Sequence, residues 1–578
     1  VFDARYRRRR NNRLITFHTR KKEGNKMRYV FPKRIVYTEG QIENPGSLLK
    51  EKVLQIGLYE YDCAVINGNS SIILDFGKEL SGGVRIITKS ADPSEIVRLR
   101  FGESVGETCA EIGEKNATND HSVRDMNVRL VRLSDMTFGQ TGFRFLRIDF
   151  PEKSSFAVKS IVAACDDTAR EESGKFTCSD DRMNEIWQTA AYTLKLCLKN
   201  GYVWDGIKRD RLVWIGDIYP ETKTSFCLYP DVPEIKNSLI FCRDQTDEGV
   251  WMNGIPNYSA WWIYNLYEYY MRTSDEGFVK ENLGFVKRIV RDFYPFVDED
   301  GTTRLPFDFI DWGSHYVGKD DSSDFDENDP ESARELDKKY DELAGTNYLL
   351  RIIMKKAEFL LDKFGEDSSL AREIVGRLER KTHRVRRYKQ IAALAILAGE
   401  ETQENLDVIL NGGAQGLTTF LNYFIFKAMA KMNERDEAEA MIREYYGKML
   451  DLGATTFWED FDVEWFENAN RIDEMLQSGK VDPHGDKGRF CYTGYRHSFC
   501  HGWASGVLAY MTEYIAGIRP IEDKPDEYEL DPYLGSLDYV KAVYPTLKGN
   551  VEVEIKKNPD GSYVKNVTAP KGIKVTVK

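Results

Sequence analysis

The chain has 578 residues, of which 42% are hydrophobic and 30% are charged, an ordinary balance for a folded protein with a large core. Acidic residues outnumber basic ones by 93 to 81 and give a net charge of −12. That charge disfavours nucleic acid as the main partner, because a phosphate-binding surface needs a local basic excess. The longest apolar run, Ile391 to Ala398, falls well short of the roughly 18 residues of a membrane span, so no membrane partner is expected.

The nine cysteines are scattered, and none forms a CxxC pair, which argues against a zinc ribbon or a thioredoxin-like motif. This usage is typical of free thiols in a reducing compartment, so we expect a cytoplasmic location. Because the chain starts at Val1 without a methionine, removal of a secretion signal is kept as an alternative. A homodimer is also left open.

Residues 1–168 are predicted to form an antiparallel, jelly-roll-like β-sandwich. Short apolar or alternating stretches are separated by turn signals at Gly82-Gly83, Asp92-Pro93 and Gly139, a spacing typical of such a sandwich. About the first 30 residues, which include the basic run Arg7 to Arg10, are expected to be irregular.

Residues 169–518 are predicted to be almost wholly helical, with long aromatic-rich loops between the helices. An apolar face runs from Met183 to Leu198 over about four turns, and Ser179 is the expected N-cap. Similar apolar stretches lie at 349–360, 391–398, 419–429, 438–450 and 503–515.

After Gly517 the pattern changes back to strands. Residues 551–555 alternate between apolar and acidic side chains, 558–561 offer a turn, and 573–577 alternate again. Residues 519–578 are therefore predicted to form a small β-sandwich. The whole chain is expected to be a multidomain protein of α and β structure in the order β, α, β.

The segment from Trp204 to Asp217 carries the densest mixture of charges and aromatic side chains. It holds three carboxylates, three cations and two tryptophans in fourteen residues. A solvated loop does not need two tryptophans, and a core segment does not carry six charges, whereas a concave polar site with aromatic walls accommodates both. The alternative is a buried ion-pair network that joins helices.

Other segments also place carboxylates beside aromatic residues. They are 453–461, with Glu459 next to Trp458, then 307–312, with Asp311 next to Trp312, and a tryptophan-rich stretch that includes Trp262. Carboxylates that face each other across an aromatic-lined cleft are what glycoside hydrolysis requires, because one protonates the leaving oxygen while the other activates water or attacks carbon. Aromatic faces suit the C–H faces of a sugar ring.

Rival kinds of site are weaker. The chain has no GxSxG, Walker or HExxH motif, and no GxGxxG followed by a helix. His497 and His501 share an i, i+4 spacing that could bind a metal, but no third ligand is evident nearby. The acidic run 320–329 lacks the glycine and the spacing of a calcium loop, so it is expected to be a solvated loop. Neither a metal nor a cofactor is predicted.

Several segments together resemble a known family. Residues 205–217 read D-G-I-K-R-D-R-L-V-W-I-G-D, residues 453–459 read G-A-T-T-F-W-E, and residues 498–506 read S-F-C-H-G-W-A-S-G. With Asp75-Phe-Gly77, Gly82-Gly83 and Gly142-Phe-Arg144, they resemble motifs of the bacterial α-L-rhamnosidases in the same order along the chain. The likeness extends over residues 70–578.

This resemblance implies an (α/α)6 barrel as the catalytic domain, flanked by antiparallel β-sandwich domains. It also implies hydrolysis of terminal α-L-rhamnosides with inversion, in which an acid of the first segment protonates the leaving oxygen and Glu459 activates the water. The first and last aspartates of that segment hold sugar hydroxyls. The residues expected to bind substrate are Asp205, Arg209, Trp214, Asp217, Trp262, Asp311, Trp312, Trp458 and His501.

The first segment is one residue shorter than the family's motif, which bears on the choice of acid. Counting from Asp205 puts Arg211 at the position of the family's catalytic glutamate, whereas counting back from Asp217 puts Asp210 there. Arginine cannot donate a proton at a useful pH, so Asp210 is the predicted general acid. Asp210 and Glu459 should then face each other across one pocket, roughly 6.5–9.5 Å apart, with room for a water between them.

Two further readings stay open. The helical domain could act on a different sugar, or the chain could bind carbohydrate without catalysis because the family's glutamate is missing. The aglycone cannot be read from the sequence, because specificity beyond the terminal sugar resides in loops.

Overall fold

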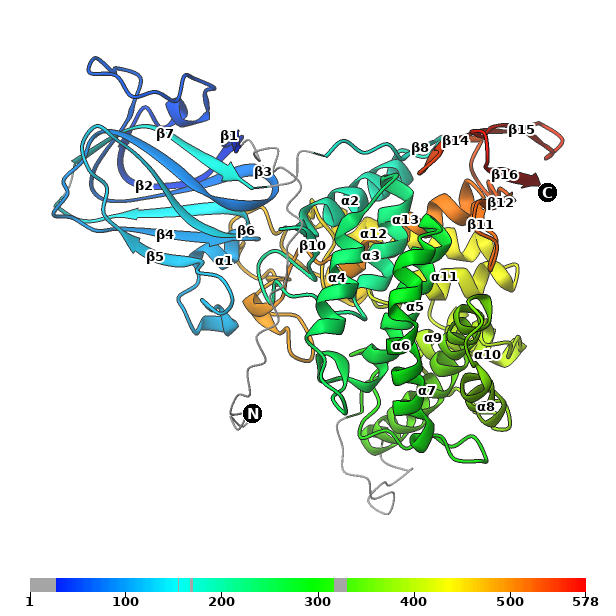
Figure 1. Ribbon diagram of the computed structural model, residues 1–578. Coiled ribbons are helices and arrows are strands. Elements are labelled where there is room, and N and C mark those ends of the chain that lie inside the picture. The colour runs from blue at the N-terminus through cyan, green and yellow to red at the C-terminus, as the bar shows by residue number, and fades with distance from the viewer. Residues whose placement is uncertain (1–26, 154, 167–169, 317–329) are drawn as a thin grey trace.

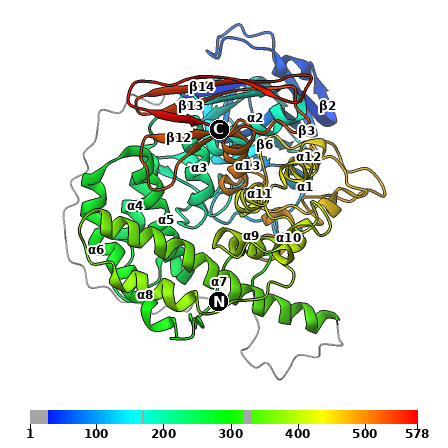
Figure 2. The same cartoon turned by 90° about the vertical axis from the view of Figure 1, so that its right-hand side faces the viewer.

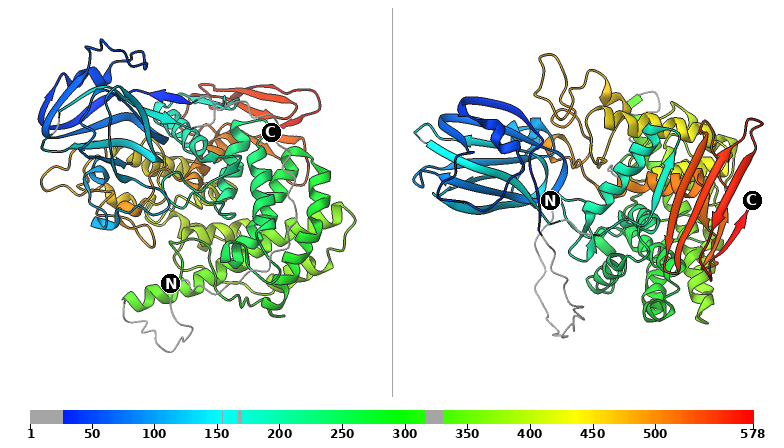
Figure 3. Two further views of the ribbon diagram at one scale, coloured as in Figure 1. Left: turned by 60° about the vertical axis from the view of Figure 1, so that its left-hand side comes forward. Right: turned by 90° about the horizontal axis from the view of Figure 1, so that it is seen from above.

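The computed structural model describes residues 27–153, 155–166, 170–316 and 330–578 (Figure 1). The basic run 7–10 and the acidic run 320–329 lie outside these residues. A lobe of strands, a body of helices and a second group of strands follow one another along the chain. Figure 3 shows the two groups of strands on opposite sides of the helices.

The N-terminal lobe is a seven-stranded sheet in which every paired strand runs antiparallel. The pairing shifts register at Gly82, where φ is 146° and a Cβ would lie 2.2 Å from the carbonyl oxygen of Ala164, so only glycine fits. In sheet order the strands are β1 (Arg28–Val30), β7 (Ser155–Cys165), β3 (Ala64–Ser90), β6 (Ser134–Phe150), β4 (Val97–Gly102) and β5 (Asp125–Val128), with β2 (Arg34–Glu43) paired to β3.

The helical body follows the predicted apolar stripes closely. Its helices are α2 (Asp181–Cys197), α3 (Ile218–Leu228), α4 (Pro233–Asp244), α5 (Pro256–Thr273), α6 (Glu276–Phe293), α7 (Pro330–Lys363), α8 (Ser369–Leu378), α9 (Lys389–Leu397), α10 (Gln403–Leu410), α11 (Asn422–Lys431), α12 (Arg435–Asp451) and α13 (Gly506–Tyr510). Short pieces are the strands β9 (Leu198–Lys199) and β10 (Tyr202–Val203), the 3-10 helices η3 (Met252–Gly254), η4 (Tyr294–Phe296), η6 (Val463–Phe466), η7 (Gly494–Arg496) and η8 (Gly502–Ser505), and the π-helix η9 (Met511–Ile515).

Helix α2 begins one residue later than the sequence predicted. Its N-cap is Asp180, whose carboxylate accepts from the backbone N–H groups of Arg182 at 2.8 Å and Met183 at 3.2 Å. The predicted cap, Ser179, instead accepts a hydrogen bond from the backbone N–H of Asp538 at 2.8 Å. The predicted apolar face is buried, and the helix ends at Cys197.

The C-terminal strands form two sheets. A three-stranded sheet contains β11 (Ile518–Pro520), β12 (Glu527–Leu530) and β16 (Lys574–Val577), and a four-stranded sheet contains β15 (Tyr563–Thr568), β14 (Gly549–Lys557), β13 (Tyr539–Thr546) and β8 (Lys175–Cys178). The sequence did not predict that β8, which precedes the first helix of the body, would pair with β13. Figure 2 shows β13 and β14 at one end of the helical body, near α2 and α3.

One excursion of the N-terminal lobe reaches the helical body. It contains α1 (Val105–Cys109) and η2 (Glu114–Asn116), whereas η1 (Pro45–Leu49) lies elsewhere in the lobe. The backbone N–H of Val105 donates to the carbonyl of Ile472 at 2.8 Å, and the amide of Asn116 donates to Thr493 at 2.9 Å. Lobe and body therefore share a polar interface, and this interface borders the candidate site.

Two further observations concern the cysteines and the apolar character of the helices. All nine cysteines are free, and seven of them are buried. In the described part of the chain, no helix combines the length and the apolar character needed to cross a bilayer.

Candidate active site

The charged segment 204–217 forms a closed loop between β10 and α3. Two hydrogen bonds between Asp205 and Leu212 close the loop. The backbone N–H of Asp205 donates to the carbonyl of Leu212 at 3.0 Å, and the N–H of Leu212 donates to Oδ1 of Asp205 at 2.8 Å. At its tip, Asp210 and Arg211 have φ values of 52° and 57°, in the left-handed region that such residues seldom adopt. The loop, one residue shorter than the rhamnosidase motif, thus closes through a strained turn that carries the predicted acid.

A pocket lies beside this loop, and most of the predicted site residues meet there although they come from distant segments. It has a volume of about 70 Å³, less than a small-molecule site usually offers. The predicted residues that line it are Asp205, Arg209, Asp210, Trp214, Asp217, Trp312, Glu459 and His501.

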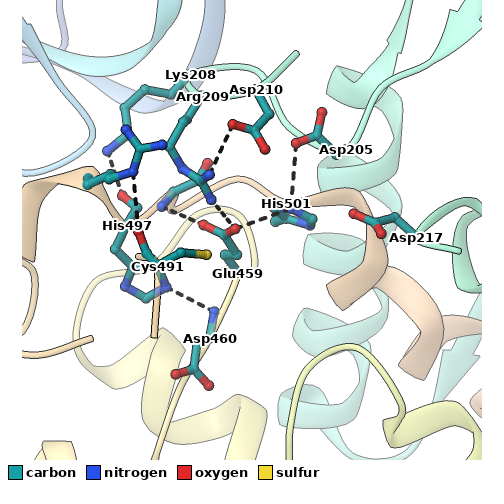
Figure 4. Close-up of polar contacts among 12 residues, drawn as sticks. Asp205, Lys208, Arg209, Asp210, Asp217, Glu459, Asp460, Cys491, His497 and His501 are labelled. Carbon is teal, nitrogen blue, oxygen red and sulfur yellow. Dashed lines mark hydrogen bonds and ion pairs between the residues drawn. The ribbon is translucent and has the colours of Figure 1, made fainter. Parts of the chain in front are cut away.

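Arg209 connects the two predicted catalytic carboxylates (Figure 4). Its Nη1 lies 3.1 Å from Oδ1 of Asp210, and its Nη2 forms an ion pair with Oε1 of Glu459. The contact with Asp210 uses one nitrogen and is not a bidentate pair. Arg211 turns away and donates to the side chain of Gln140 in the N-terminal lobe. One guanidinium therefore holds both carboxylates at the pocket.

The loop around Glu459 is fixed by backbone contacts. The N–H of Glu459 donates to the carbonyl of Ser498 at 2.9 Å, and the N–H of Ser498 donates to Oε2 of Glu459 at 3.2 Å. The indole of Trp503 donates to the carbonyl of Glu459 at 2.9 Å. Burial raises the pKa of Glu459, although the charge of Arg209 acts in the opposite direction.

Burial raises the pKa of two aspartates in the pocket. Burial raises the pKa of Asp205 well above its usual value, and the negative charges of Asp210 and Asp217 add to this effect. Burial also raises the pKa of Asp217 to about 8, although its Oδ1 accepts a hydrogen bond from the hydroxyl of Tyr258 at 2.6 Å. A protonated carboxyl group both donates and accepts, which suits the hydroxyls of a sugar.

His501 lies between two of these carboxyl groups. Its Nε2 is 3.6 Å from Oε1 of Glu459 and 3.9 Å from Oδ2 of Asp205. Burial lowers the pKa of His501 well below its usual value, and the charge of Arg209 lowers it further, so the ring is neutral. In the described residues, Nδ1 of His501 and Nε1 of Trp214 are buried without a hydrogen-bond partner. Both atoms are available to a ligand.

Five residues of the pocket wall were not predicted as site residues. Phe309 and Trp503 lie inside segments that the sequence analysis singled out, and Ile255 and Tyr258 flank Pro256 at the start of α5. Cys491 follows no pattern that could have revealed it. The aromatic members contact one another: Trp214 and Tyr258 lie 6.2 Å apart at a steep angle, as do Phe309 and Trp312 at 5.1 Å. The pocket therefore has the aromatic walls that were expected.

Three predicted substrate-binding residues, Trp262, Trp458 and Asp311, are not among the residues that line this pocket. Trp262 is fully buried and donates its indole N–H to the carbonyl of Leu239 at 2.9 Å. Trp458 is fully buried and stacks on Phe499 at 3.9 Å. Asp311 is buried one residue before Trp312 and accepts from the hydroxyl of Thr418 at 2.5 Å. Each side chain is turned into the packing between helices and loops.

The residues offer little to a metal ion. The backbone N–H of Asp460 donates to Nε2 of His497 at 2.9 Å, so that atom is already engaged. In the described parts of the chain, Glu103, Glu107 and His484 form a group that could hold a metal. However, Nζ of Lys208 lies 2.9 Å from Glu103 and 3.4 Å from both Glu107 and Nε2 of His484. The ammonium group of Lys208 therefore already occupies the position that a metal cation would take.

A larger cavity of about 1260 Å³ adjoins the pocket. It begins at Gly313, directly after Trp312, and Phe490 forms part of its wall. Trp312 and Phe490 stack with ring centres 6.3 Å apart. One of these two stacked rings thus lines the small pocket, and the other lines the larger cavity.

Part of the chain matches a known family. Residues 171–333 match the family model described as the bacterial alpha-L-rhamnosidase 6 hairpin glycosidase domain. No curated protein matches the chain.

Solved rhamnosidase structures share the fold. The GH78 family rhamnosidase of Bacillus sp. GL1 has a TM-score of 0.69 and 18% identity, over 92% of this chain and 55% of that one. The Streptomyces avermitilis α-L-rhamnosidase complexed with L-rhamnose has a TM-score of 0.66 and 16% identity, over 88% and 48%. The Klebsiella oxytoca rhamnosidase with rhamnose bound has a TM-score of 0.62 and 19% identity, over 84% and 95%. The chain therefore spans about half the length of the first two.

Fold and site together define a multidomain protein of mixed α and β structure, similar to the rhamnosidase structures. Its described strand pairs are antiparallel except for that of β12 and β16, which run parallel. The resemblance to the bacterial α-L-rhamnosidases that the motifs indicated is confirmed by the family model, which matches residues 171–333.

Proposed function

We propose that the chain removes a terminal α-L-rhamnose from an oligosaccharide or a glycoside by an inverting mechanism. The observation that carries this proposal is that one pocket is lined by all three rhamnosidase-like segments, through Asp210, Glu459 and His501. The rhamnosidase structures that contain rhamnose support a carbohydrate as the substrate. We also propose that residues 169–518 form an (α/α)6 barrel, flanked by β-sandwich domains of residues 1–168 and 519–578.

In this mechanism Asp210 gives its proton to the leaving oxygen while Glu459 takes a proton from the attacking water. The two carboxyl groups then act on opposite faces of the sugar carbon. Their shared contact with Arg209 supports this assignment, because it directs both toward the same space. Asp205 and Asp217 bind hydroxyl groups in protonated form, and the unpartnered nitrogens of Trp214 and His501 add further polar contacts.

A second assignment gives the acid role to Asp205. It is favoured by the burial of this carboxyl group, which raises its pKa as a general acid requires. Asp205 also lines the pocket within 3.9 Å of His501. Separate Asp205→Asn and Asp210→Asn variants distinguish the two assignments, because only loss of the true acid makes the rate depend steeply on the leaving group.

The experiment that tests the function is an assay with an aryl α-L-rhamnoside, followed by a panel of other aryl glycosides. Turnover of the rhamnoside with β-rhamnose as the first product, detected by proton NMR, supports the proposal. Turnover of another glycoside alone would assign a different sugar. Saturable binding of rhamnose without turnover of any substrate would make the chain a carbohydrate-binding protein.

A further inference from the structure

A histidine from the N-terminal lobe contacts the predicted acid. His121 lies in the excursion of the lobe that follows η2, with about a third of its side chain exposed. Its Nδ1 is 2.9 Å from Oδ1 of Asp210, and the backbone N–H of Asp210 donates to the same nitrogen at 2.7 Å. Two atoms of one residue thus converge on a single imidazole nitrogen across the interface between lobe and body.

The other side of the ring faces a second carboxylate. Nε2 of His121 is 3.2 Å from Oδ1 of Asp120, whose Oδ2 accepts from Nη1 of Arg496 at 2.5 Å. Asp120 therefore favours a proton on Nε2, which leaves Nδ1 as an acceptor toward Asp210. Arg209 contacts Asp210, and the carboxyl groups of Glu459, Asp205 and Asp217 also act on Asp210 across the pocket.

The contact between Nδ1 of His121 and Oδ1 of Asp210 requires a proton. With a proton on Nε2, a neutral imidazole has one lone pair on Nδ1, and the backbone N–H of Asp210 already points at it. A carboxylate oxygen at 2.9 Å would then place a second lone pair against that nitrogen. The distance is favourable only when a proton lies between the two atoms, and that proton belongs on Oδ1 of Asp210, because a proton on Nδ1 would face the backbone N–H of Asp210.

We propose that His121 and Asp210 share one proton and that His121 is a positioning residue that restores the proton of the acid after each turnover. This inference rests on the proposed function. When the glycosidic bond breaks, the proton of Asp210 goes to the leaving oxygen and Glu459 receives a proton from the attacking water. The exposed ring of His121 then takes one proton from solvent and passes it to Asp210, and Glu459 releases its own to solvent. The sum is hydrolysis by one water.

The kinetic test uses His121→Gln, which keeps a polar side chain but cannot titrate. We expect kcat/KM to fall tenfold or more with an alkyl rhamnoside, below the ~10²–10⁴-fold that a general acid contributes. With a dinitrophenyl rhamnoside we expect little loss, and KM should stay the same for both substrates. The basic limb of the pH profile should also move.

The matched control is His383→Gln, the same change at a partly buried histidine that contacts Tyr348, away from the pocket. It should leave the rates and the pH profile as in the wild type. Asp120→Asn should produce a weaker version of the His121→Gln effect, since it removes only the partner of Nε2. Melting curves of all variants identify any loss of folding.

A readout that does not need turnover separates this inference from the proposed function. In protein labelled with ¹⁵N in its histidine rings, the signals lost in His121→Gln belong to His121. Their titration midpoint should move in Asp210→Asn and stay unchanged in Glu459→Gln. If wild-type protein cleaves no rhamnoside, the proposed function fails, but this measurement still decides whether the proton is shared.

Two results would overturn the inference. One is an equal loss on both rhamnosides without a shift of the basic limb, which a purely structural contact would produce. The other is a His121 titration that is the same with and without the carboxyl group of Asp210.

Discussion

The guanidinium of Arg209 is paired with the carboxylate of Glu459 inside the pocket, and the two side chains are only 6% and 4% exposed. A buried pair of this kind keeps the carboxylate ionised although burial favours its neutral form. The predicted base is thus charged and fixed in place before substrate enters.

Removal of this arginine should change the pH dependence of catalysis. In Arg209→Leu the pKa of Glu459 should rise further, because the burial that raises it is no longer opposed by a positive charge. Since the base must be ionised, the acidic limb of kcat/KM should move to higher pH by about one unit or more. A pH profile with a dinitrophenyl rhamnoside measures this limb. An unchanged limb would assign it to another group.

The two predicted catalytic residues should respond differently to the leaving group. Asp210→Asn should abolish turnover of rhamnosides with poor leaving groups, on the order of 10²-fold or more, and spare an activated aryl rhamnoside. Glu459→Gln should damage both substrates equally, because water must be activated whatever departs. The measurement is a plot of log kcat/KM against the pKa of the leaving group. Equal, mild effects of Asp210→Asn on all substrates would shift the acid role to Asp205.

Burial of the Asp217 carboxyl group in the pocket should destabilise the folded protein at neutral pH. Its pKa of about 8 in the folded protein lies above the ordinary value of about 3.9 in the unfolded chain. The folded state therefore binds the proton more tightly, so stability falls as pH rises between these two values. Asp217→Asn removes this penalty and should raise the free energy of unfolding at pH 7.5 by about 1–3 kcal/mol, with little change near pH 4. Chemical denaturation at both pH values measures it.

Asp166 provides a control, because its pKa is shifted in the opposite direction from that of Asp217. The ammonium of Lys199 and the side chains of Gln140 and Ser81 hold the pKa of Asp166 below its usual value, in spite of burial. Its contribution to stability is present above the unfolded pKa and is lost on acidification, so Asp166→Asn should destabilise the protein at pH 7.5. A stabilising effect of both substitutions would mean that the shifts do not govern stability.

Phe490 should matter for long substrates only. It is 40% exposed, stacks on Trp312 and forms part of the wall of the larger cavity. Phe490→Ala should raise KM for a rhamnose-capped oligosaccharide about 5- to 10-fold, the value of one aromatic contact, and leave an aryl rhamnoside unaffected. Phe466→Ala, at a phenylalanine of similar exposure outside both cavities, is the control. Equal KM values for both variants would exclude the larger cavity from substrate binding.

The sequence revealed the helices and the approximate place of the site for a physical reason. A stripe such as Met183 to Leu198 is periodic because one helix face is buried, and the charges of 204–217 are incompatible with a core. The same pattern does not show whether an aromatic ring faces a pocket or the core, so Trp262 and Trp458 were assigned to the pocket although both are fully buried. The contact of His121 with Asp210 joins residues 89 positions apart and has no local signal.

The pairing of β8 with β13 has a consequence for how the protein holds together. Residues 175–178 follow the N-terminal lobe in the chain and form one strand of a sheet whose other strands lie between 539 and 568. Helix α2 begins shortly after β8, so its start is anchored by strands that follow the helical body in the chain and are made after it during synthesis. The helical body therefore cannot reach its final, cooperative state until these strands are in place. A chain cut after residue 518 would expose an unpaired strand edge and should aggregate instead of folding as a smaller enzyme.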